Sequence, residues 1–181
     1  IVFDVFFSEV VTGFTASDVA LTGDATGVSI TVSGSGSTYA IRATGVAGDG
    51  TIVPTIPAGS ATDAAGNGNQ DSTSIDGSVT YDSTRPTVTI NQAAGQSDPV
   101  STLPIVFSIV FSEAVTGFDA SDIAFVSGTG LTYDVTGSGA MYTLNVTAAD
   151  DGVLTPTIPA GAAVDAVGWT SAASTSTDNS V

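Results

Sequence analysis

An internal repeat restricts the fold of this chain more than any other feature of its sequence. The stretch IVFDVFFSEVVTGFTASDVAL at residues 1–21 returns as IVFSIVFSEAVTGFDASDIAF at 105–125. Further on, PTIPAGSATDAAG at 54–66 returns as PTIPAGAAVDAVG at 156–168. A period of roughly 100 residues is too long for a solenoid turn or a propeller blade, which repeat every 20–50 residues. The repeat therefore predicts two whole domains in tandem.

Apolar residues alternate with polar ones within each copy, which is typical of β-strands with one buried face. In the second copy Ile105, Phe107, Ile109 and Phe111 would point inward. Clusters of Gly, Ser, Asp and Pro separate such runs, and the GSG sequences at 34–36 and 137–139 indicate hairpin turns. Many short strands with turn signals between them predict an all-β sandwich. We expect strands at 86–92, 105–111, 123–126, 131–135, 141–147, 153–158 and 174–181.

The charge balance excludes several classes of partner. Two Arg and no Lys stand against eighteen carboxylates, which gives a formal net charge of -16. Such a surface repels nucleic acid and anionic lipid. No apolar run approaches the roughly 20 residues that a bilayer-spanning helix needs, so we expect no membrane insertion. The chain begins at Ile1 inside an apolar run, and we expect it to be a window of a longer polypeptide.

The chain also lacks the side chains of ordinary catalysis. It contains no His, Cys or Lys, so a conventional pair of nucleophile and base cannot be built. The absence of Cys removes disulfides as a brace, and the absence of Lys removes isopeptide cross-links. We therefore expect a protein that is not an enzyme, braced by packing, by neighbouring domains or by a bound ion.

Three motifs carry a resemblance to a known family. YDSTRPTVTINQ at 81–92, FSEAVTGF at 111–118 and ATDAAGN at 61–67 resemble the tandem bacterial immunoglobulin-like repeats of large secreted adhesins and surface proteins. The resemblance implies two immunoglobulin-like Greek-key β-sandwiches, at residues 1–84 and 85–181. The first would lack its A strand, because no equivalent of 85–104 precedes it. Arg85 is a departure, since relatives usually carry a small residue there.

This resemblance also implies a function and a localisation. Such repeats are structural spacers or stalks outside the cell or at its surface, and they contact neighbouring immunoglobulin-like repeats of the same or an adjacent chain. Two alternatives stay open. The chain could be a filament subunit that assembles by strand donation into its incomplete first domain, or a module that binds carbohydrate or ice through exposed Thr and Ser rows or Trp169.

Carboxylates mark one place in the repeat. The only two Glu, Glu9 and Glu113, occupy the same position of the two copies. In a sandwich with this strand order, Glu113 after the second strand, Asp165 in the last loop and Asp82 before Arg85 would converge at the junction of the domains. A cluster of like charges is relieved by a cation. Oxygen ligands without His or Cys favour Ca²⁺. The full predicted set is Asp82, Glu113, Asp122 and Asp165, matched in the first copy by Glu9, Asp18, Asp63 and Asn67.

Local turn chemistry is the alternative explanation of the same residues. Asp and Asn are favoured in turns and at helix N-termini whether or not a ligand is bound. The sequences DAAGN and FDASD would then be Asx-turns or caps of a short helix. The sequence alone leaves both explanations open.

Overall fold

A computed structural model describes the whole chain, residues 1–181. The chain divides into two compact units, unit 1 at Ile1–Ser83 and unit 2 at Thr84–Val181. Each unit has a hydrophobic core of its own. This boundary, between Ser83 and Thr84, lies one residue before the boundary that the sequence predicts, between residues 84 and 85. The chain contains no helix long and apolar enough to cross a membrane.

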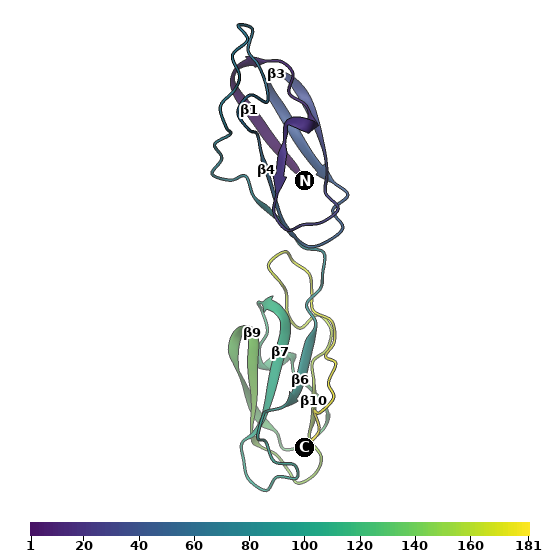
Figure 1. The fold of residues 1–181 in the computed structure, drawn as a ribbon. Coiled ribbons are helices and arrows are strands. Elements are labelled where there is room, and N and C mark those ends of the chain that lie inside the picture. The colour runs from purple at the N-terminus through teal and green to yellow at the C-terminus, as the bar shows by residue number, and fades with distance from the viewer. The chain divides into compact units, whose positions relative to one another are not determined.

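Unit 2 is built from two packed antiparallel sheets. One sheet has β7 between β6 and β9, as Figure 1 shows, and the other pairs β8 with β10. A 3-10 turn, η2, connects β7 to β8. The bounds are β6 Val88–Gln92, β7 Ile105–Val115, η2 Ala120–Asp122, β8 Ala124–Ser127, β9 Thr132–Ala148 and β10 Thr155–Thr157.

The long strand β9 folds back on itself at the GSG sequence. The Thr147 hydroxyl donates a hydrogen bond to the Thr132 carbonyl, and the Asn145 amide donates one to Asp134. Gly137 has a φ of +127°, and a Cβ there would come within 2.4 Å of the Met141 carbonyl oxygen. Only Gly fits such a position. The two strands expected at 131–135 and 141–147 are therefore the halves of one hairpin.

The alternating apolar residues of β7 form the centre of the unit 2 core. Phe107 and Ile109 are completely buried, and Phe111 nearly so. Phe111, Phe118 and Tyr142 pack edge to face around one another, with ring centroids 5.0–5.9 Å apart. The Tyr142 hydroxyl lies 3.4 Å from the Val115 carbonyl that accepts its hydrogen bond. The trio thus fixes the end of β7, where the candidate site begins.

Unit 1 repeats this plan with the same number of strands, divided differently between its two sheets. Strand β1 pairs with β3 alone, and a second sheet has the order β2-β4-β5. The bounds are β1 Val2–Val11, the 3-10 turn η1 Ala16–Asp18, β2 Ala20–Thr22, β3 Ser29–Thr44, β4 Gly50–Thr55 and β5 Val79–Tyr81. The aromatic trio is present again as Phe7, Phe14 and Tyr39, with the Tyr39 hydroxyl bonded to the Val11 carbonyl. The same residues thus fold the same way in both copies.

The last expected strand, 174–181, is not regular. Its backbone runs beside β6, where Thr175 donates to the Val88 carbonyl and Gln92 donates to the Asp178 carbonyl. Between these two backbone hydrogen bonds, side chains act as the acceptors. The Ser176 hydroxyl accepts the Ile90 N–H, and the Asn91 side chain accepts the N–H groups of residues 177 and 178. Ser and Asn side chains compete with the backbone for such bonds. The segment follows the path of a strand without the ladder of one.

Candidate metal centre

The candidate centre is built on a short loop that presents Asp165. One carboxylate oxygen, Oδ1, accepts hydrogen bonds from the backbone N–H groups of Val167, Gly168 and Trp169, at 2.7–2.9 Å. Gly168 has a φ of +101°, which a residue with a side chain rarely adopts. The loop is closed by the Asp165 N–H, which donates to the Trp169 carbonyl. Asp165 is therefore held rigidly by its own loop.

A pair of backbone hydrogen bonds places this loop beside the end of β7. Thr116 and Val164 exchange N–H···O bonds of 2.8 and 3.0 Å. Glu113 lies three residues before Thr116 and inside β7, not in the loop after it as the sequence suggested. The strand continues to Val115 through an irregular stretch between Val110 and Val115. Such bulges redirect side chains near functional sites.

Glu113 and Asp165 bring their carboxylates together. One oxygen of each lies within 4.8 Å of the other, so the structure brings these two predicted residues together. Glu113 is half-buried, and Asp165 is only 5% exposed. The second oxygen of Asp165, Oδ2, is buried and has no hydrogen-bond partner. A buried carboxylate oxygen in that state is costly, and buried polar atoms in folded proteins almost always have a partner.

The equivalent loop of unit 1 satisfies its own carboxylate. Asp63 accepts bonds from the N–H groups of Ala65 and Asn67 on Oδ1, and from the Asn67 side-chain amide on Oδ2. The repeat aligns Asn67 with Trp169, whose side chain has no amide group, and Oδ2 of Asp165 has no hydrogen-bond partner. The donor that completes the loop of unit 1 is thus missing from the loop of unit 2. This replacement explains why Oδ2 of Asp165 is left without a partner.

The remaining predicted ligands of unit 1 have local roles or stay apart. The structure does not gather Glu9, Asp18 and Asp63 into one group of carboxylates. Glu9 is exposed on β1. The Asp18 carboxylate accepts from the N–H and the hydroxyl of Thr15, which closes a capping box on η1. In unit 1 turn chemistry therefore accounts for Asp18 and Asp63, and Glu9 lies on a strand apart from both.

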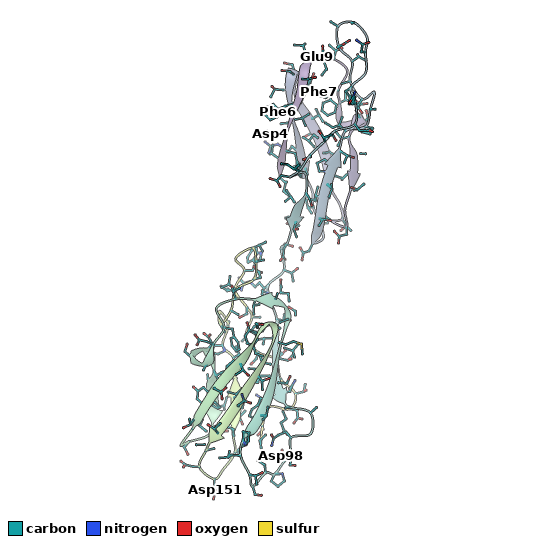
Figure 2. The ribbon with its side chains drawn as sticks, turned by 90° about the vertical axis from the view of Figure 1, so that its left-hand side faces the viewer. Asp4, Phe6, Phe7, Glu9, Asp98 and Asp151 are labelled. Atoms are coloured by element: carbon teal, nitrogen blue, oxygen red, sulfur yellow. The ribbon has the colours of Figure 1, made fainter.

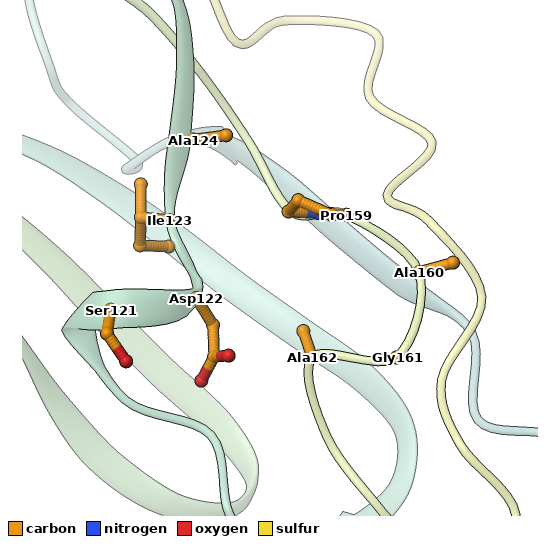
Figure 3. A pocket seen from close by; sticks show the side chains of 8 residues that line it. All are labelled: Ser121, Asp122, Ile123, Ala124, Pro159, Ala160, Gly161 and Ala162. Carbon is orange, nitrogen blue, oxygen red and sulfur yellow. The ribbon is translucent and has the colours of Figure 1, made fainter.

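Asp122 of unit 2 has the same capping role as Asp18. Its carboxylate accepts the Asp119 N–H at 2.9 Å, at the start of η2. The residue borders a shallow pocket opposite Pro159 and Ala162, which Figure 3 shows, and no second carboxylate lines that pocket. The structure therefore keeps Asp122 apart from the pair of Glu113 and Asp165.

Asp82 comes directly after β5, at the end of unit 1, and is half-buried. Because the pair of Glu113 and Asp165 belongs to unit 2, the part of Asp82 in the site stays a prediction. Arg85, the departure from the family pattern, places its guanidinium 5.8 Å from the centre of the Trp169 ring, a cation–π distance.

The loop of unit 1 leads to a prediction about acidity. The Asn67 side-chain amide, followed by its backbone N–H, lowers the pKa of the Asp63 carboxyl below its usual value. The substitution Asn67→Ala should raise that pKa towards the usual value, as measured by ¹³C NMR titration. A lowered pKa stabilises the fold above the ordinary pKa of Asp, and this contribution is lost as the pH falls through the lowered value. The variant should therefore lose stability at neutral pH and differ little from the parent in acid.

Asp24 is the internal reference in the same titration. Its pKa is lowered by the backbone and side-chain hydrogen bonds of Thr51, which the substitution does not touch. The titration of Asp24 should not move. An unchanged pKa of Asp63 in the variant would show that the side-chain amide of Asn67 does not stabilise the carboxylate.

The fold and the loop together define a class: tandem all-β sandwich modules, one of which carries a carboxylate pair at the end of a central strand. Comparison with family models gives a match to the bacterial Ig-like domain over residues 82–181. The chain belongs to this family of bacterial immunoglobulin-like domains, as its resemblance to such repeats predicts. No curated protein and no solved structure gave a match.

Proposed function

We propose that the chain is a spacer of an extracellular bacterial adhesin or surface filament, with the movement between its two immunoglobulin-like units limited by Ca²⁺. The tandem repeat supports the spacer role, because the two like units, each with a core of its own, repeat one structural module along the chain. Family membership supports a generic module of this kind. The surface charge adds support, since it favours cations over anionic partners.

The observation that carries the calcium proposal is the buried Oδ2 of Asp165 beside Glu113. Two oxygens that bind one Ca²⁺ at about 2.3–2.6 Å can be up to about 5 Å apart. The 4.8 Å limit between the two carboxylates fits that span. Ca²⁺ tolerates an irregular shell of six to eight oxygens, which carbonyls and water can complete. Asp82 is the third carboxylate that we assign to the shell.

Calcium bound in this way would have a mechanical role. A ligand contributed by Asp82 would tie the last residues of unit 1 to the pair in unit 2 and restrict the movement of one unit against the other. Extracellular modules bind Ca²⁺ with Kd values of about 10⁻⁴–10⁻³ M, which keeps them empty at the low concentrations inside cells. A secreted spacer would therefore become stiff only after export.

Small-angle X-ray scattering of the whole chain, in Ca²⁺ and in excess EDTA, tests this function. We expect a narrower distribution of interatomic distances and a larger maximum dimension in Ca²⁺. The double substitution E113Q/D165N should abolish the difference, and Mg²⁺ at the same concentration controls for screening of the net charge. Scattering curves that superimpose in Ca²⁺ and EDTA would contradict the proposal.

Assembly by strand donation stays a prediction from the sequence. A role in binding carbohydrate or ice stays a prediction from the sequence.

A further inference from the structure

The loop that presents Asp165 in unit 2 and its copy in unit 1 hold their carboxylates in the same way. Asp63 and Asp165 each accept backbone N–H bonds on Oδ1. The N–H of each donates to the carbonyl four residues later, at 3.0 and 3.1 Å. Gly66 and Gly168 occupy the same place in the two loops, with φ values of +87° and +101°. The hydrogen bonds of the two loops can therefore be compared one by one.

The two loops differ in what meets the second carboxylate oxygen, Oδ2. In unit 1 the side-chain amide of Asn67 donates to Oδ2 of Asp63 at 2.8 Å. In unit 2 the equivalent residue is Trp169, and Oδ2 of Asp165 is buried without a hydrogen-bond partner. An amide N–H brings partial positive charge to an acceptor. The Asn67 amide therefore satisfies in unit 1 the same oxygen that a cation would satisfy in unit 2.

Burial and charge make the missing donor unfavourable in unit 2. Asp165 is only 5% exposed, and an acceptor buried without a partner is costly. Glu113 brings a second carboxylate within 4.8 Å of it, which adds repulsion between like charges. Oδ2 of Asp165 therefore favours a ligand that carries positive charge.

Unit 1 lacks both of these conditions. Glu9, the counterpart of Glu113, is exposed near the end of β1, where Figure 2 labels it. Asp63 is half-buried, and its Oδ2 already has the amide donor. An ion that approached Oδ2 of Asp63 would first have to displace the Asn67 amide. The loop of unit 1 is therefore complete without an ion.

We propose that residue 169 decides whether the loop of unit 2 takes a cation, although its side chain is not a ligand. The Trp ring has a single N–H donor and no acceptor, so it cannot coordinate a metal. Asn at this place would complete the loop from within the chain, as in unit 1, whereas a residue without an amide leaves Oδ2 of Asp165 to a cation. This role of residue 169 rests on the proposed calcium site, and it limits the chain to one such site in its two units.

The substitution Trp169→Asn tests this role on the whole chain, because it leaves every carboxylate in place. Isothermal titration calorimetry should show Ca²⁺ binding weakened at least about tenfold, since the new amide must leave Oδ2 before the ion can bind. In EDTA, unit 2 of this variant should melt about 4–8 °C above unit 2 of Trp169→Leu, a shift typical of one net hydrogen bond in a domain of this size. NMR signals of unit 2 followed against temperature measure that shift.

Two control variants separate the added amide from the loss of the Trp ring. Trp169→Leu removes the ring and its contact with Arg85 without adding a donor. It should keep Ca²⁺ affinity within about fivefold of the parent chain. Trp169→Asp has the shape of the Asn variant without its N–H donors, and its added charge should leave Ca²⁺ affinity at least equal to that of the parent. Should Trp169→Asn fail to fold, Trp169→Gln supplies the same amide on a longer arm.

The outcomes distinguish the role of residue 169 from the calcium site itself. Equal Ca²⁺ binding by the parent and by Trp169→Asn would overturn the role and leave the calcium site standing. Equal weakening in all three variants would also overturn it, because the ring and not the amide would then matter. An absence of Ca²⁺ binding in the parent and in every variant would contradict the proposed function, and the role of residue 169 with it.

Discussion

Saturating Ca²⁺ should raise the melting temperature of unit 2 by about 10–20 °C. At a free concentration one hundred times the Kd, a ligand that binds only the folded state stabilises it by about 2.7 kcal/mol. In a domain of about 100 residues, each kcal/mol corresponds to about 4–8 °C. The measurement is Trp fluorescence against temperature, because the only Trp of the chain, Trp169, lies in unit 2 beside Asp165. The comparison is made in Ca²⁺, in equal Mg²⁺ and in EDTA.

The substitution Asp165→Asn tests whether the calcium-dependent rise in melting temperature depends on Asp165. The amide group would replace the unpartnered Oδ2 with a donor that can bond Glu113, much as the Asn67 amide meets Asp63 in unit 1. In EDTA the variant should be at least as stable as the parent chain, and in Ca²⁺ it should lose the shift. The control is Asp63→Asn, which should leave the calcium shift of unit 2 unchanged. A full shift that survives in Asp165→Asn would place the ion elsewhere.

Phe107→Ala should destabilise unit 2 by about 3–5 kcal/mol, because its ring is completely buried and its removal leaves a cavity in a packed core. The matched substitution in unit 1 is Phe3→Ala. Phe3 is half-buried beside the open edge of β1, so its loss should cost no more than about 2 kcal/mol. Urea denaturation, followed by Trp fluorescence for unit 2 and by NMR for unit 1, measures both.

The contrast between these two Phe residues tests the packing of the repeat. If Phe107→Ala unfolds unit 2 outright, Phe107→Leu gives a smaller loss that can still be measured. Equal losses at the two positions would show that unit 1 packs its β1 residues as tightly as unit 2 packs those of β7. The unpaired edge of β1 would then not weaken the packing of Phe3 in unit 1.

Much of the fold follows from the sequence because the signals are strong and repeated. The alternation from Ile105 to Phe111 predicts β7, and its copy in residues 1–21 predicts β1. The GSG sequences predict the hairpin of β9, since Gly137 needs a φ that other residues avoid. Family membership and the all-β fold are confirmed in this way.

Other features depend on competition between side chains and backbone that periodicity does not reveal. Residues 174–181 have the composition of a strand, yet Ser176 and Asn91 take the bonds that a regular ladder would use. The sequence predicts Glu113 in a loop, but β7 continues past it through an irregular stretch. The sequence predicts Asp18 and Asp122 as metal ligands, and the structure shows each of them capping a 3-10 turn.

One difference between the two copies of the sequence bears directly on the candidate site. The repeat aligns Asn67 with Trp169, which removes an amide donor from one of two otherwise similar loops. The physical consequence, an unpartnered oxygen on Asp165, appears only when the hydrogen bonds of both loops are compared. Differences between repeats can therefore point to a site more clearly than their similarities.

Isothermal titration calorimetry of the whole chain with Ca²⁺ tests the central claim most directly. The account predicts a single site with a Kd of about 10⁻⁴–10⁻³ M. It also predicts that E113Q and D165N each abolish the binding, and that D63N leaves it intact. An absence of binding up to about 10 mM Ca²⁺, or binding that survives in D165N, would contradict the claim that Asp165 and Glu113 form a calcium site.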